Sequence, residues 1–294
     1  MAIAKNNPKY YVYIHTDSRK INITGALLGL TLTENAKELA QKVTMSFTNV
    51  THEGKTLASH INVHDKVYIY ASTGDGAKEV FRGYVWTDVY EKGDGNVVNL
   101  TCYDRLIYLM ESEEYRYIPK GKTTKAIFKL LCDAKGIDLS YNHSTMKHAK
   151  MTIRGTLADV FWDDLLENVR KKTGKRGVIR MTKSKMEVFT EGNGNSTIWK
   201  FTKGSEGNII KTKHESTLDG LTTKVIILGK EEDGKAPTKA TLKKNTDKYG
   251  TIQKIMQSSD SDKLATVKKE AQQTLNDYAK PQLDKEVTAV DIPW

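Results

Sequence analysis

The sequence contains little cysteine: Cys102 and Cys132 are the two cysteines among 294 residues. Each lies within an apolar pattern, and neither belongs to a C-x-x-C pair. We therefore predict two separate buried thiols, and a disulfide between them is the alternative. Free thiols are typical of a protein that is made in a reducing cytosol.

Long apolar runs are absent as well. No segment approaches the ~20 apolar residues of a membrane helix. The first fifteen residues, MAIAKNNPKYYVYIH, contain no apolar run of signal-peptide length. We therefore expect no membrane partner and no secretory leader. Hydrophobic residues still make up 38% of the chain, enough for a core, and the length allows two or three domains of ~100–200 residues.

Sequence signatures of catalysis are also missing. The chain contains no H-E-x-x-H, no G-x-S-x-G, no phosphate loop and no dinucleotide fingerprint. His60 and His64 fall on one face of a predicted strand, with His52 and Glu53 upstream. No second ligand set follows at a metal-binding spacing, so we interpret these histidines as solvated or hairpin-edge residues. We predict no enzyme activity, no metal and no cofactor.

Two carboxylate pairs are the remaining candidates for acid–base chemistry. Asp163 and Asp164 lie in a predicted helix, where adjacent side chains point in different directions. Glu113 and Glu114 follow the first β-rich region, and we expect them to be solvated. A hydrolase dyad stays open as an alternative, but no pattern here favours one.

Positive charge is concentrated in the middle of the chain. The net charge is +10, and residues 106–200 contribute 18 basic and 11 acidic side chains. Within them, RKKTGKRGVIRMTKSK (170–185, the basic run) holds eight basic residues and no acidic residue. Its candidate partner-contact residues are Arg170, Lys171, Lys172, Lys175, Arg176 and Arg180.

Two interpretations of the basic run remain open. The functional one is an anion-binding patch for nucleic acid or an acidic partner. The structural one is that basic residues complement the dipole at a helix end and protect an exposed hairpin edge. The run has no aromatic residue before Phe189, which argues against single-strand binding.

Residues 10–104 favour a β-rich region because β-branched, aromatic and apolar residues alternate there. Strands are predicted at 10–17, 42–47, 66–72, 79–90 and 96–102. Two G-D-G triplets, at 74–76 and 93–95, are expected as hairpin loops, and the spacing favours a small barrel or sandwich. ENAKELAQ (34–41) is predicted to be either a short helix or a long loop.

The middle third predicts a small α+β domain. Helices are expected at 123–136, ending at Gly136, and at 156–174, where Thr156 begins a capping box and Gly174 ends the helix. Residues 176–190 are predicted to form a hairpin that turns near Lys183–Ser184.

The last third returns to β structure around a single helix. Strands are predicted at 208–217, 221–229, 249–257 and 286–292, with a polar loop at 231–239 and a helix at 260–279 that Pro281 ends. The fold class is therefore α+β and β-rich. We predict domains at 1–105, 106–200 and 201–294, with the outer two as variants of one β-barrel unit.

One segment carries a family resemblance: CYDRLIYLMESEEYRYIPKGKTTKAIFKLLCDAKGIDLSY (102–141). A strand ends in Y-D-R-L, and an aromatic-Pro-x-G-x-T stretch leads to a helix closed by Gly-Ile. Together with Phe81, Gly83 and Val85, this resembles the baseplate hub proteins of contractile phage tails, especially those of PBSX-type prophages and R-type bacteriocin particles. Late control protein D and the amino-terminal part of type VI spike proteins belong to the same family.

The resemblance implies two tail-tube-like β-barrels joined by the small α+β domain, with Asp104 and Arg105 where the first barrel ends. It implies a homotrimer in the baseplate of a virion or tail-like particle, synthesised in the bacterial cytoplasm, that adapts the sixfold tail tube to the threefold spike. The implied partners are the tail tube protein, spike or baseplate proteins and, as a further candidate, a tape-measure protein, with no specific nucleic acid. Relatives often add a short strand after the last one, so completeness of the second barrel at Trp294 stays open.

Two other functions stay open. One is a nucleic-acid-binding β-barrel protein, which the basic run would support. The other is a hub-associated peptidoglycan hydrolase, because tail hubs and spikes often carry or recruit one.

Overall fold

The computed structural model describes residues 9–35, 38–72, 76–90, 96–192, 209–232, 234–258 and 264–289. The chain divides into two compact units. The first unit comprises Met1–Val169, Lys175–Lys200 and Asp291–Trp294, and the second comprises Arg170–Gly174 and Phe201–Val290. Each unit is described by itself, and the predicted domain boundaries after residues 105 and 200 stay predictions.

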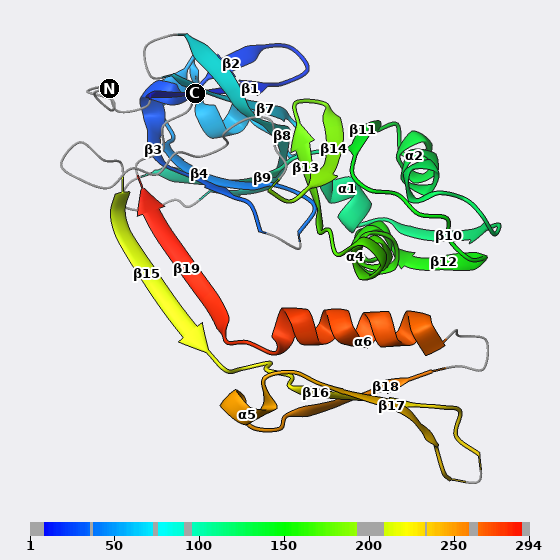
Figure 1. Ribbon diagram of the computed structural model, residues 1–294. Helices are drawn as coiled ribbons and strands as arrows, with labels where there is room; N and C mark the ends of the chain where they lie inside the picture. Colours follow the sequence, from blue (N-terminus) through cyan, green and yellow to red (C-terminus); the bar gives the residue numbers. More distant parts are fainter. Residues whose placement is uncertain are drawn as a thin grey trace. The chain divides into compact units, whose positions relative to one another are not determined.

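The first unit begins with a seven-stranded antiparallel sheet (Figure 1). The strands follow the order β2-β1-β7-β8-β9-β4-β3. Their bounds are β1 Lys9–His15, β2 Lys20–Asn22, β3 Leu27–Thr33, β4 Lys42–Thr48, β7 Lys66–Ser72, β8 Ala77–Tyr90 and β9 Val97–Tyr103. The five strands predicted here are confirmed. Both predicted G-D-G loops fall, wholly or in part, outside the described residues.

A single core cluster explains the curvature of this sheet. Ile21 of β2 and Leu30 of β3, from opposite edges, pack on the same cluster as Phe47 and Phe81. Strands at both edges therefore curl around one core. No ladder joins β2 to β3 among the described residues, so the described sheet is open, and β3 is an edge strand with Leu28 61% exposed.

Gly83 of β8 lies against the backbone of Tyr103 in β9. A Cβ at this position would stand 2.2 Å from the carbonyl oxygen of Tyr103 and 2.6 Å from Cζ of Phe81. The Phe-x-Gly-x-Val segment therefore requires glycine because of the neighbouring backbone, since no side chain fits in this space.

Two short elements connect β4 to β7: the hairpin of β5 (Thr51–His52) with β6 (Lys55–Thr56), and the 3₁₀ helix η2 (Leu57–His60). The prediction that His60 and His64 share a strand face is therefore wrong: His60 ends η2, and His64 occupies a turn with φ 73°. The described residues of 34–41 form no helix, which favours the loop alternative.

The rest of the first unit is an α+β region with its own core. It contains α1 Ile107–Met110, β10 Glu113–Ile118, α2 Thr124–Ala134, β11 Asp138–Asn142, β12 Met151–Thr156, α3 Leu157–Asp159, the π-helical η3 Val160–Leu166, the start of α4 Glu167–Thr173, β13 Gly177–Thr182 and β14 Lys185–Thr190. Strand β10 pairs with β12, and β14 lies between β11 and β13. Phe128 of α2 stacks on Phe161 of η3 with ring centroids 4.4 Å apart.

The predicted helices and hairpin of the middle third are confirmed. Thr123 and Thr156 cap their helices by accepting from the backbone N–H three residues later, at 3.2 Å in each case. Gly136 and Gly174 follow the helix ends with φ 64° and 72°. The hairpin turns at Lys183, with φ 57°.

Strands β10, β11 and β12 were not anticipated, and one expectation about them is wrong. Glu114 is not a solvated carboxylate: its side chain is 13% exposed and accepts a hydrogen bond from Arg116 at 3.3 Å. Glu113 is exposed, as expected.

The second unit contains a three-stranded sheet covered by one helix. Its elements are β16 Lys224–Leu228, β17 Thr238–Lys243, α5 Thr246–Tyr249, β18 Gln253–Gln257 and α6 Leu264–Tyr278. Ala271 and Leu275 of α6 are buried against Val225 and Ile227 of the central strand β16. The predicted helix is confirmed where it is described. Strand β17 begins inside the polar segment predicted as a loop.

A separate two-stranded ladder completes the second unit. It pairs β15 (Ile209–Thr217) with β19 (Gln282–Ala289). Every side chain from residue 210 to 216 is exposed, and Leu283 of the partner strand is 58% exposed. A two-stranded ribbon without a covering layer is marginally stable in water, so within the described residues this ribbon lacks the packing that a barrel wall would receive.

Replacing Gly83 by alanine should destabilise the first unit by about 1–3 kcal/mol, because the added methyl overlaps the β9 backbone. Urea denaturation followed by circular dichroism would measure this loss. Gly25→Ala is the matched control, since a Cβ there meets nothing within 4 Å. Equal stabilities of the two variants would contradict the close-approach explanation.

Candidate functional site

The basic run is divided between the two units. Arg170, Lys171 and Lys172 occupy the last turn of α4 and fall in the second unit, whereas Lys175, Arg176 and Arg180 fall in the first. The basic run is continuous in sequence, but its residues belong to two units that are described separately.

Acidic partners neutralise part of the run. Arg170 forms an ion pair with Asp277, both in the second unit. In the first unit, Arg176 lies 3.7 Å from Glu191. These pairs agree with the structural interpretation, in which basic residues serve a helix end and a hairpin.

Arg180 is engaged on the β13–β14 hairpin. Its guanidinium lies 3.5 Å from the carboxylate of Glu187, directly across the ladder. The same group lies over the ring of Phe189 at 5.1 Å. Exposed positive charge in the run is thus carried mainly by lysines such as Lys171 and Lys172, and their contact with a partner stays a prediction.

A buried carboxylate stands at the junction between β9 and α1. Asp104 is 1% exposed, and its side chain accepts hydrogen bonds from the backbone N–H groups of Gln41 at 3.0 Å and Leu106 at 2.8 Å. Its own N–H donates to the carbonyl of Gln41 at 3.1 Å. These bonds attach the segment before β4 to the first turn of α1.

Burial raises the pKa of Asp104 to about 7, and the two backbone donors oppose this rise. The nearby charge of Glu34 raises the pKa further. The hydrogen bonds of Asp104 position backbone. Asp104 does not line the cavity described below, so we assign it a structural role.

Aromatic side chains surround the same junction. His64 stacks on Tyr84 with centroids 4.9 Å apart, and Tyr108 of α1 meets Tyr84 at 5.9 Å and Trp86 at 5.8 Å. His64 therefore packs against rings that join the sheet to α1. This placement explains His64 without a metal.

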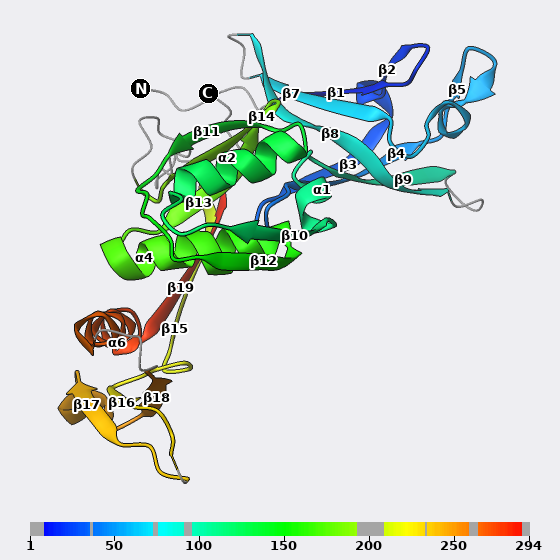
Figure 2. The same ribbon diagram turned by 90° about the vertical axis from the view of Figure 1, so that its right-hand side faces the viewer.

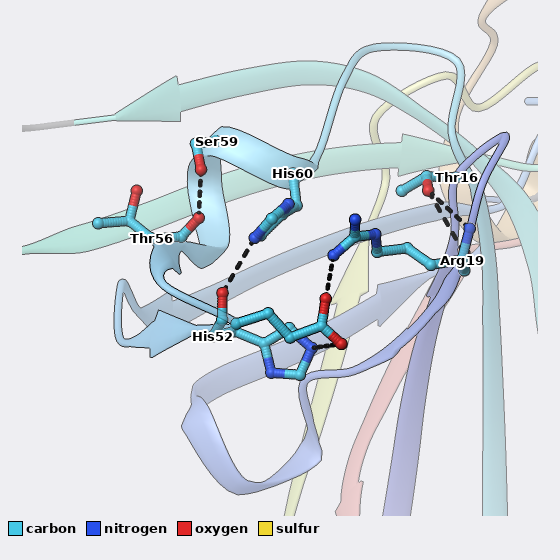
Figure 3. Close-up of polar contacts among 7 residues, drawn as sticks. Thr16, Arg19, His52, Thr56, Ser59 and His60 are labelled. Atoms are coloured by element: carbon cyan, nitrogen blue, oxygen red, sulfur yellow. Dashed lines mark hydrogen bonds and ion pairs between the residues drawn. The ribbon is translucent and has the colours of Figure 1, made fainter.

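The other upstream histidines belong to a polar group on the β5–β6 hairpin (Figure 3). Glu53 forms an ion pair with Arg19 and lies 3.9 Å from Nε2 of His52. The ring of His60 makes a 3.1 Å hydrogen bond with the carbonyl of His52. The bond of His60 thus joins η2 to the hairpin.

No cluster of three or more His, Cys, Asp or Glu side chains able to hold a metal occurs in the described ranges. A cavity of about 310 Å³ beside the hairpin is lined by Asn22, Gly25, Ala26, Thr48, Val50, His52 and Leu57. His52 is the one titratable side chain in this lining. The cavity therefore offers no acid–base pair.

The remaining candidates also lack converging chemistry. Cys102 and Cys132 are buried free thiols, as predicted, and burial raises the pKa of each to about 12. Asp163 and Asp164 lie in η3 and are exposed. Partial desolvation by the surrounding protein, followed by the charges of Asp163 and Asp159, still raises the pKa of Asp164. Within the described ranges, no helix has the length and hydrophobicity to cross a bilayer.

Sequence reasoning missed one group of exposed residues. Tyr115 and Tyr117 stand on β10, with 79% and 61% of their surfaces exposed. A sequence signal for a positively charged surface around them was available: residues 115–132 and 139–158 contain no acidic residue. The structure pairs these two segments.

A family model described as YQBQ-like matches residues 30–293. No curated protein matches the chain. Solved structures with a similar fold include two tail proteins, both covered by this chain over most of their length.

The prophage MuSo2 43 kDa tail protein from Shewanella oneidensis has a TM-score of 0.66 and 13% identity, and the alignment covers 96% of this chain and 83% of that one. The tail protein from Neisseria meningitidis MC58 has a TM-score of 0.64 and 14% identity, with 93% and 79% coverage. The PdpA–VgrG complex gives a TM-score of 0.51 and 11% identity, over 89% of this chain and 50% of that one. At these identities the likeness establishes the fold.

The pKa of Asp104 predicts a pH-dependent stability. The folded chain keeps a proton on Asp104 that the unfolded chain releases near pH ~4, so the stabilising contribution is complete below that pH and is lost as pH rises through about 7. The melting temperature of the wild type, relative to that of Asp104→Asn, should therefore fall as the pH rises from about 4 to about 7. Thermal unfolding followed by circular dichroism measures the difference.

The exposed Asp88→Asn variant is the control, and its difference from the wild type should not vary over the same range. A wild-type-to-Asp104→Asn difference that is constant with pH would show that Asp104 does not exchange its proton on unfolding.

Proposed function

The chain belongs to the YQBQ-like family, whose model matches residues 30–293, and we propose on this basis that it is a structural component of a phage tail or tail-like particle. One observation carries the proposal: two tail proteins share its fold over 93% and 96% of its length.

The more specific proposal is a baseplate hub. In this role three chains form a ring that adapts the sixfold tail tube to the threefold spike, and the two β-rich regions take tube-like places in the ring. The open edge β3 and the uncovered β15–β19 ribbon support this reading, because both leave backbone or apolar surface for neighbours to cover.

The proposed partners follow from this position. They are further copies of the chain, the tail tube protein, spike or baseplate proteins, and a tape-measure protein as a further candidate. A ring of three chains needs head-to-tail contacts in which each interface complements the next. Stable interfaces of this kind bury ~2,000 Å² or more.

A map of the assembled particle tests the hub proposal. We expect three copies between tube and spike, which together contain three times the 33.1 kDa of one chain. Six copies per ring, or a position away from the junction between tube and spike, would overturn the hub assignment while leaving a tail role intact.

The basic run is proposed to face outward, toward acidic baseplate or spike neighbours. Lys171→Glu/Lys172→Glu should then lower the fraction of chain incorporated into purified particles, because the exposed charges would repel an acidic neighbour. Lys268→Glu/Lys269→Glu on α6 makes the same charge change at exposed positions and serves as control. Equal incorporation of both variants, or a run that lines the channel, would count against this orientation.

We also propose that the chain is not an enzyme. A zymogram on cell-wall substrate should show no clearing by the purified chain, with a known peptidoglycan hydrolase as positive control. Clearing by the chain alone would favour the hydrolase alternative.

A further inference from the structure

Two segments without acidic side chains are joined by the β10–β12 ladder (Figure 2). Residues 115–132 and 139–158 contain no Asp or Glu and together hold eight Lys or Arg side chains. The ladder runs from Glu113–Thr156 to Ile118–Met151, and a bridge between Thr123 and Lys147 continues the pairing. The fold thus brings positive charge from distant parts of the sequence together in the first unit.

Most of this charge is not neutralised. Arg116 pairs with Glu114 at 3.3 Å, and Lys129 pairs with Asp133 at 2.9 Å. The other six cations are exposed and form no ion pair with any residue of the described ranges. They are Lys120, Lys122, Lys125, Lys147, Lys150 and Arg154.

Two aromatic rings stand on the exposed face of the same ladder. Tyr115 and Tyr117 are 79% and 61% exposed, and their two-residue separation places them on one face, ~6.6–6.8 Å apart along the strand. Arg154 lies directly across the ladder from Tyr115. Neither tyrosine ring contacts another ring or forms a hydrogen bond within the described part of the chain. The two tyrosines and the six cations are called the tyrosine–lysine surface.

The opposite face of the ribbon is not available. Ile118 and Ile153 are 1% and 0% exposed and belong to the core of the α+β region. A β-ribbon that enters a duplex groove must be free to insert, whereas this ribbon presents one face as a platform. This geometry suits an extended strand that lies across the surface better than it suits a double helix.

We propose that the tyrosine–lysine surface binds single-stranded nucleic acid without sequence preference. Bases stack on Tyr115 and Tyr117, while the lysines and Arg154 contact the phosphates. Exposed rings beside a positive track are the combination that such binding uses. The basic run lacks it, since Arg180 already covers Phe189.

The composition of the surface favours nucleic acid over an acidic protein. Five of its eight side chains are lysines, which are depleted at the centres of protein–protein interfaces. Interfaces with nucleic acid are much more positively charged. The proposal is independent of a role in the tail, because it rests on the ladder and its charges alone.

Fluorescence anisotropy of labelled oligo(dT) and oligo(rU) with the full chain tests the proposal. Binding should weaken with salt, with a slope of log K on log salt of up to about −4 if all six cations contact phosphates. Tyr115→Ala/Tyr117→Ala should weaken binding roughly tenfold or more. Tyr115→Phe/Tyr117→Phe keeps both rings and should bind as the wild type does. Tighter binding of oligo(dT) or of oligo(rU) identifies DNA or RNA, respectively, as the preferred ligand.

A charge-reversal pair locates the binding surface. Lys120→Glu/Lys150→Glu should reduce binding and make the salt slope shallower, whereas Lys171→Glu/Lys172→Glu in the basic run should change it little. Circular dichroism checks that each variant is folded. Incorporation of the chain into purified particles is measured separately. A chain that enters particles but binds no oligonucleotide contradicts this proposal and not the proposed tail role.

Four results would overturn the proposal. They are no oligonucleotide binding at low salt, tighter binding of a duplex than of a single strand, loss of binding in the basic-run variant alone, and a Tyr115→Ala/Tyr117→Ala variant that binds like the wild type. If polyglutamate of matched charge also competes as well as the oligonucleotide does, and the alanine variant binds like the wild type, the surface binds acidic proteins instead.

Discussion

The hydrogen bonds of Asp104 are the constraint on which the first unit depends. The Asp104 side chain is 1% exposed and accepts hydrogen bonds from the backbone N–H groups of Gln41 and Leu106. It thereby fixes the turn from the last strand of the sheet into α1 and attaches the chain that leads into β4. The curled sheet and the α+β region have separate cores, and the backbone hydrogen bonds of Asp104 join them beside the aromatic packing of Tyr84, Trp86 and Tyr108. Removal of the Asp104 carboxyl group would leave these two buried N–H donors unsatisfied, which costs free energy of folding.

Charge follows the fold rather than the sequence. The basic run is contiguous, yet ladder and helix partners such as Glu187 and Asp277 neutralise three of its arginines. The tyrosine–lysine surface is invisible as a run, because its cations come from two segments that the β10–β12 ladder pairs. Charge density on a surface depends on which strands are neighbours. Counting basic residues along the chain therefore overestimates the free charge of the basic run and misses the tyrosine–lysine surface.

Uncovered β structure connects the fold to the proposed assembly. The edge strand β3 exposes Leu28, and the β15–β19 ribbon exposes Leu283. The second unit has a small core in which α6 covers one face of the three-stranded sheet. Exposed backbone edges favour pairing with another chain, and a structural protein of a ring or tube uses such edges in its assembly. Contacts with neighbouring chains would cover the edges that the described sheets leave open.

The sequence by itself determined the elements with strong local signals. Alternation in YYVYIH and KVYIYAS, the capping residues Thr123 and Thr156, and the glycines after the helices specify their structures through nearby atoms, so reading the chain sufficed. Strands β3, β10 and β17 (LLGLTLT, EEYRYI and TKATLK) were not anticipated, and the neighbouring strands decide their pairing. Tertiary structure alone decided that His64 stacks on Tyr84, that the side chain of Glu114 is largely buried, and that the exposed Tyr115 lies across the ladder from Arg154. Burial and charge at these positions depend on residues distant in sequence, and that dependence is the physical reason why local patterns could not reveal them.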